Sequence, residues 1–176
     1  FNVPNVNQCK HCHIGSGAPL PVGPKARYLN MDYAYPAGAE NQLVHWTKTG
    51  RLTGLADPAT APKAPDWDDP DSGTLDERAR TYLDINCAHC HSPGGPAYTS
   101  GLDLRYESPV AAGRAASIGR YDIVPGDPDK SILLYRLATT DPGVRMPTTG
   151  RSLVHDEGVE LIREWIANMA APTRTN

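Results

Sequence analysis

The chain has 176 residues, a formal net charge of −3 and no strongly basic stretch, so nothing in it points to nucleic acid as a partner. No apolar run approaches the roughly 18 residues of a membrane-spanning helix, and no membrane span is expected. The 16 glycines and 17 prolines, against a single phenylalanine, indicate a loop-rich fold with a thin side-chain core.

The first pattern that carries chemistry is Cys9-x-x-Cys12-His13, which follows a brief N-terminal segment. Cys-x-x-Cys-His is the attachment signature of c-type haem. Thiols three residues apart lie on the same side of a helical turn, so both can reach the vinyl groups of one porphyrin edge. The next residue projects under the ring, which makes His13 the expected proximal iron ligand.

The organisation predicted for the chain is two modules and a connector. Residues 1–55 form a short haem c module, with a Pro/Gly-rich loop and then a helix at about residues 40–49. Residues 56–72 are rich in proline and form an extended connector. Residues 73–176 form a longer haem module.

A capping box at Thr74 and Glu77 opens the second module, and the helix that it starts runs into the motif Cys87-x-x-Cys90-His91. This second copy of the spacing makes His91 the other expected proximal ligand. Further helices are expected from Asp127-Pro128 to about residue 137 and from about residue 156 to 169.

Met146 is the expected sixth ligand of the second haem. It lies in the polar loop DPGVRMPTTG before the last helix, where no helical stripe could use it as a core residue. Met169, in contrast, completes the apolar stripe of the last helix.

Zinc is the alternative to haem, because four cysteines could form an all-thiolate site. The long gap between the pairs and the two histidines that follow them favour two haem c groups. His11 and His89, in the middle of the motifs, are expected to face solvent or form a local hydrogen bond.

The distal ligand of the first haem stays open between Met31, His45 and no ligand from this chain. Met31 is preferred because it precedes its helix, as Met146 precedes the last one. His45 points away from the mean direction of its apolar neighbours Leu43, Val44 and Trp46.

These features resemble class I cytochrome c, which implies a mostly α fold: two haem modules, the first shortened, with extensive loops and little or no sheet. Gly23-Pro24 is similar to the loop of that class whose proline carbonyl accepts a hydrogen bond from the proximal histidine, so the resemblance assigns this role toward His13 to Pro24. Stretches such as GPKARYLNMDY, NQLVHWTKTGRL and RARTYLDINCAHCHSPGG resemble a family of bacterial periplasmic dihaem c-type cytochromes. Its members are often longer at the N-terminus, so the chain is expected to be their haem-bearing C-terminal part.

The expected function is transfer of single electrons between periplasmic redox proteins, in an exported protein that is a carrier and not an enzyme. Two alternatives remain: a peroxidase-like enzyme with an open first haem, and an electron-accepting domain of a dehydrogenase complex. Several cations could pair with haem propionates or simply be solvated: Lys25, Arg27, Arg105, Arg120, Arg145 and Arg151.

Overall fold

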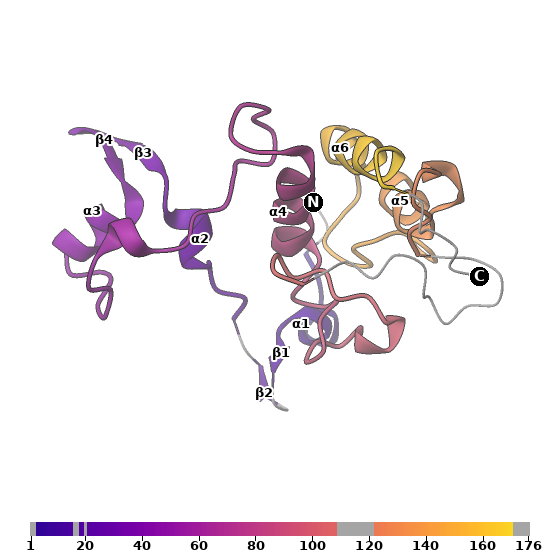
Figure 1. Ribbon diagram of the computed structural model, residues 1–176. Helices are drawn as coiled ribbons and strands as arrows, with labels where there is room; N and C mark the ends of the chain where they lie inside the picture. Colours follow the sequence, from indigo (N-terminus) through magenta and orange to yellow (C-terminus); the bar gives the residue numbers. More distant parts are fainter. Residues whose placement is uncertain (1–2, 16–17, 20, 109–121, 171–176) are drawn as a thin grey trace.

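The computed structural model describes residues 3–15, 18–19, 21–108 and 122–170. Within these ranges the fold is mostly helical, with two small antiparallel hairpins (Figure 1). The elements in chain order are α1 (Val6–Cys12), β1 (Ile14–Gly15), β2 (Ala18–Pro19), α2 (Ala26–Leu29), β3 (Asp32–Tyr35), β4 (Gly38–Asn41), α3 (Gln42–Lys48), η1 (Pro58–Thr60), α4 (Leu75–Asn86), η2 (Tyr98–Ser100), η3 (Pro128–Lys130), α5 (Ile132–Ala138) and α6 (Asp156–Ala167).

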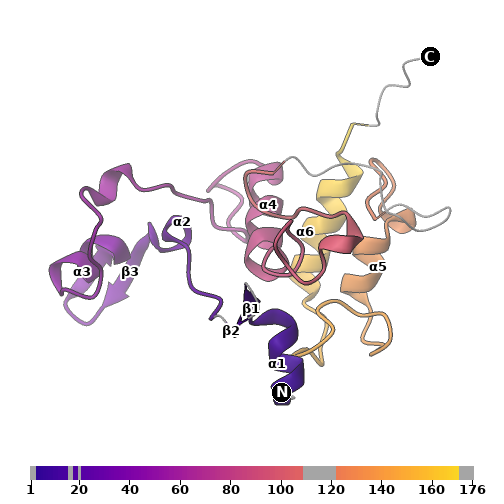
Figure 2. The same cartoon turned by 90° about the horizontal axis from the view of Figure 1, so that it is seen from below.

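The hydrophobic core lies where α4, α5 and α6 pack together (Figures 1 and 2). The capping box predicted for α4 is confirmed: Thr74 accepts from the Glu77 backbone, and the Glu77 side chain accepts from the Thr74 backbone. The Trp165 indole of α6 donates to the Asp76 carboxylate at 2.8 Å, which ties α6 to the first turn of α4. Gly158 lets α6 approach the ring of Tyr82 on α4.

A separate lobe is formed by α2, the β3–β4 hairpin and α3, on the far side of α4 from α5 (Figure 1). Leu43 is its deeply buried apolar side chain. The Asn41 side chain caps α3 by accepting from the Leu43 and Val44 backbones. Asn30 donates to the Ala61 carbonyl at 2.8 Å and so fastens this lobe to the connector.

The proline-rich connector returns the chain to α4 and packs on it. Trp67 lies against Tyr82 and His155, with ring centroids 5.4 and 5.1 Å apart. The Arg78 side chain donates to the Trp67 carbonyl at 3.1 Å. The connector therefore shields one side of the core.

The mostly helical architecture agrees with the prediction, and α3, α4, α5 and α6 fall in the predicted places. The hairpin of the four-residue strands β3 and β4 is a difference, because no strand was expected there. Its signal was the alternation of Tyr33 and Tyr35 before a turn that ends at Gly38, whose φ of +124° suits glycine.

Candidate functional site

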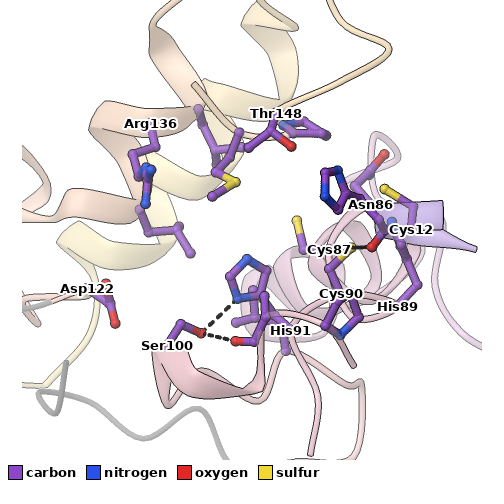
Figure 3. Close-up of a pocket in the computed structure, with 18 of the residues that line it drawn as sticks. Cys12, Asn86, Cys87, His89, Cys90, His91, Ser100, Asp122, Arg136 and Thr148 are labelled. Carbon is purple, nitrogen blue, oxygen red and sulfur yellow. Dashed lines mark hydrogen bonds between the residues drawn. The ribbon is translucent and has the colours of Figure 1, made fainter. Parts of the chain in front are cut away.

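The second Cys-x-x-Cys-His motif opens onto a cavity that it shares with the predicted methionine. Helix α4 ends at Asn86, and the motif turns immediately beneath it, so that Cys87, Cys90 and His91 line the cavity together with Met146. Figure 3 shows Cys87 and His91 directed into this space, with Arg136 and Thr148 on the opposite side. The cavity between these walls has a volume of about 230 Å³.

Ser100 orients the His91 ring. The Ser100 hydroxyl donates to the Ala97 carbonyl at 2.8 Å and lies 3.0 Å from His91 Nδ1, so it accepts the Nδ1 proton (Figure 3). This tautomer leaves Nε2 free to bind a metal. Burial, then the charges of Arg136 and His89, lower the pKa of His91, which favours the neutral imidazole that metals bind.

Contacts with the end of α5 hold the loop that carries Met146. The Met146 backbone donates to the Arg136 carbonyl at 2.9 Å, and Arg136 Nε donates to the Val144 carbonyl at 2.7 Å. Arg151 donates to the Leu137 carbonyl at 2.6 Å. The loop is therefore fixed on the cavity wall, although it has no regular secondary structure.

The donor set of this cavity fits haem c. Two thiols, an imidazole and a thioether meet in a space with mainly apolar walls such as Leu104 and Leu133. Burial, with the neighbouring Cys90, raises the pKa of Cys87 to about 12. A bound haem would supply reversible one-electron chemistry, with His91 and Met146 as the residues that could hold its iron.

The first motif lies beside the second one. A capping box of Asn5 and Gln8 starts α1, and His13 caps its end through a backbone bond to the Cys9 carbonyl. In the part of the chain that the structure describes, the ligand atoms of Cys12, His89 and Cys90 lie within 4.8 Å of one another. The last cysteines of the two predicted haem-attachment motifs, Cys12 and Cys90, therefore lie close together, although they are far apart in sequence.

Met31 and His45 are the two residues that the sequence offers as distal ligands of the first haem, and the structure shows what surrounds each of them. Met31 is 42% exposed and lines a groove with Trp67 and Ile85. His45 Nδ1 lies 2.9 Å from the Glu40 carboxylate, and the ring stacks on Tyr35 at 3.7 Å.

Pro24 lies on the wall of a further cavity, opposite residues of the second motif that include Ala88 and His89. The role toward His13 that the resemblance assigns to Pro24 stays a prediction.

Protein groups already engage most of the candidate propionate partners. Lys25 pairs with Asp84, Arg27 with Glu107 and Arg105 with Asp103. Arg145 donates to the Thr140 carbonyl, and Arg151 donates to the carbonyls of Leu137 and Thr139 at the end of α5. Arg120 lies outside the described residues.

Asp84 and Ser100 are site residues that the sequence interpretation missed. Asp84, one turn before the second motif, accepts from Lys25 at 2.6 and 2.7 Å, from Tyr28 and from the Tyr106 backbone at 3.2 Å. The sequence feature that could have pointed to Asp84 is its position as a carboxylate on the half-buried helix just before the motif.

Comparison with known proteins bears on the second motif. A family model described as Planctomycete cytochrome C matches residues 87–150, which include Cys87, Cys90, His91 and Met146. The match supports a c-type cytochrome with a haem-based electron-transfer role, and it suggests an electron carrier of a kind that is typically exported. No curated protein and no solved structure matches the chain. Among the described residues, no helix has the length and apolar character needed to cross a membrane.

Proposed function

We propose that the protein is a dihaem c-type cytochrome that passes single electrons between redox partner proteins in the periplasm. The observation that carries the proposal is the meeting of two complete Cys-x-x-Cys-His motifs at Cys12 and Cys90. The cavity shared by His91 and Met146 supports the same reading for the second haem.

The closeness of the two motifs would allow electron transfer between the two haems. Each thioether bond fixes an edge of its ring at a cysteine sulfur, so neighbouring cysteines bring the edges of two rings close together. The protein sets each potential through the axial ligands and burial. Electrons that enter at one haem would then leave at the other without a diffusive step.

The intact mass of the denatured protein tests the proposal. It should exceed the polypeptide mass by two haems, and Cys9→Ala/Cys12→Ala should lose one of them. The matched variant Cys87→Ala/Cys90→Ala should lose the other. A bare polypeptide, a zinc-bound native protein without haem, or a single haem in the unmodified protein contradicts the proposal.

A further inference from the structure

The first haem of the proposed pair lacks an assigned distal ligand, and the structure narrows the choice. All six histidines and all three methionines lie in described parts of the chain, so each of these common iron ligands can be located. The inference that follows rests on the dihaem proposal and names a residue for its first site.

Most of these side chains are already engaged elsewhere. His91 and Met146 share the second cavity, and His155 Nδ1 lies 3.0 Å from the Tyr82 hydroxyl. His45 is held between Glu40 and Tyr35 in the separate lobe. Met169 packs against the core.

His89 differs from them in two respects. Its Nδ1 is buried and has no hydrogen-bond partner among the described residues, which leaves a polar atom without compensation. A ligand atom of its ring lies within 4.8 Å of the Cys12 thiol, where one edge of the first haem would be attached.

The space around His89 is also suitable. His89 lines a cavity of about 520 Å³ whose other wall is the segment Val22, Gly23 and Pro24, which follows the first motif closely in the chain. This cavity therefore lies between the segment that follows the first motif and the second motif, and His89 lines the cavity of the second motif together with Cys12.

We propose that His89, from the middle of the second motif, is the distal iron ligand of the first haem. Binding forms one nitrogen–iron bond from the neutral ring and transfers no electron. The orphaned imidazole would gain a partner, and each motif would contribute to the first site. With His13 and His89 as its ligands, the first haem would have a lower potential than the second, because thioether ligation raises the potential.

Electron paramagnetic resonance of the unmodified ferric protein is the first test. It should show two low-spin haems, one with two imidazoles and one with imidazole and thioether. A high-spin first haem, or two haems with thioether ligation, overturns the inference. A mass with only one haem contradicts the dihaem proposal itself, so the two failures can be told apart.

Variants provide the second test. His89→Ala should keep two haems by mass but turn the first one high-spin, and added imidazole should restore the low-spin signal. His11→Ala, at the same position of the other motif, is the matched control and should leave both signals unchanged. Retention of two low-spin haems in His89→Ala, or an equal loss in the control, overturns the inference.

His89→Met covers the case in which the alanine variant fails to mature. It keeps a ligand in place, so it should retain two low-spin haems and raise the lower of the two potentials. Unchanged potentials in this variant count against His89.

Discussion

At the scale of single residues, the sequence predicts haem attachment at the Cys-x-x-Cys-His motifs because this chemistry depends on local spacing, and the attachment itself stays a prediction. Cys87, Cys90 and His91 are neighbours in the chain, and a helical turn is enough to align them. Ser100 could not be predicted in the same way. Its hydroxyl reaches His91 only because η2 turns the chain back beneath the motif.

Ser100→Ala tests the orientation of His91. A hydrogen bond at Nδ1 makes the imidazole a more basic ligand and stabilises ferric iron, so its loss should raise the potential of the second haem. A bond worth about 1 kcal/mol corresponds to about 40 mV for a one-electron couple. Spectroelectrochemical titration measures the shift, and Ser72→Ala in the connector is the control. An unchanged or lowered potential would mean that Ser100 does not act through His91.

Asp122, on the wall of the second cavity, should make stability depend on pH. Burial raises its pKa, opposed by the charge of Arg136, and Oδ2 has no partner among the described residues. Because the folded-state pKa lies above the unfolded value, the protonated form favours the fold. Its contribution is complete below the usual aspartate range and is lost as pH rises through the folded pKa.

Asp122→Asn should therefore be more stable than the unmodified protein at neutral pH, with a flatter pH profile. Thermal unfolding of both proteins from acidic to neutral pH measures the difference in stability. The exposed Asp32→Asn on β3 is the control. Equal profiles for the two variants would exclude Asp122 as the source.

At the scale of elements, the long helices were predictable because α4 and α6 have capping signals or a continuous apolar stripe. The hairpin β3–β4 was not, since its four-residue strands give little periodic signal. The contact between α4 and α6 also escaped prediction. A glycine inside a helix indicates close approach but does not name the partner.

Gly158→Ala tests that contact. A Cβ at this position would lie 2.2 Å from the Tyr82 hydroxyl oxygen and 2.3 Å from Cζ, and Tyr82 is only 5% exposed. Overpacking should lower the free energy of unfolding by about 1–3 kcal/mol, although alanine normally favours a helix over glycine. Chemical denaturation gives the value, with Glu160→Ala on the solvent face of α6 as the control. A gain in stability would show that α4 and α6 can move apart to accommodate the added methyl group without losing stability.

At the scale of the whole molecule, the position of α1 depends on contacts between distant segments. Sequence spacing suggested a first module at residues 1–55, and this division stays a prediction. In the structure, α1 lies under the end of α4, whereas α2, α3 and the hairpin form the lobe on the far side (Figure 1). Long-range contacts of this kind leave no periodic signal in a single sequence.

The Lys25–Asp84 ion pair is one such contact between distant segments, with Lys25 Nζ 2.6 Å from a carboxylate oxygen of Asp84. The Asp84 side chain is 1% exposed and that of Lys25 is 45% exposed. Lys25→Met should cost about 2 kcal/mol of stability, because among the described residues it leaves the buried carboxylate with only Tyr28 and the Tyr106 backbone as donors. Asp84→Asn should cost less, because the freed ammonium can turn to water.

Thermal unfolding and limited proteolysis of the segment before α2 would measure both effects. Lys48→Met removes an exposed pair with Glu40 and should change stability by less than about 1 kcal/mol. If Lys25→Met is no more harmful than this control, the pair does not hold the segment on α4.

The approach of Cys12 to Cys90 also has a consequence for biosynthesis. Before haem is attached, these sulfurs are free thiols within 4.8 Å of each other. An oxidant that removes two electrons and two protons would join them as a disulfide after a small movement, since the bond is about 2 Å long. One such cross-link would block both attachment motifs at once. If the protein is the dihaem cytochrome proposed above, a reductant must therefore keep the apoprotein in the dithiol state until its cofactors arrive, and haem incorporation at either motif should fail when that reductant is withdrawn.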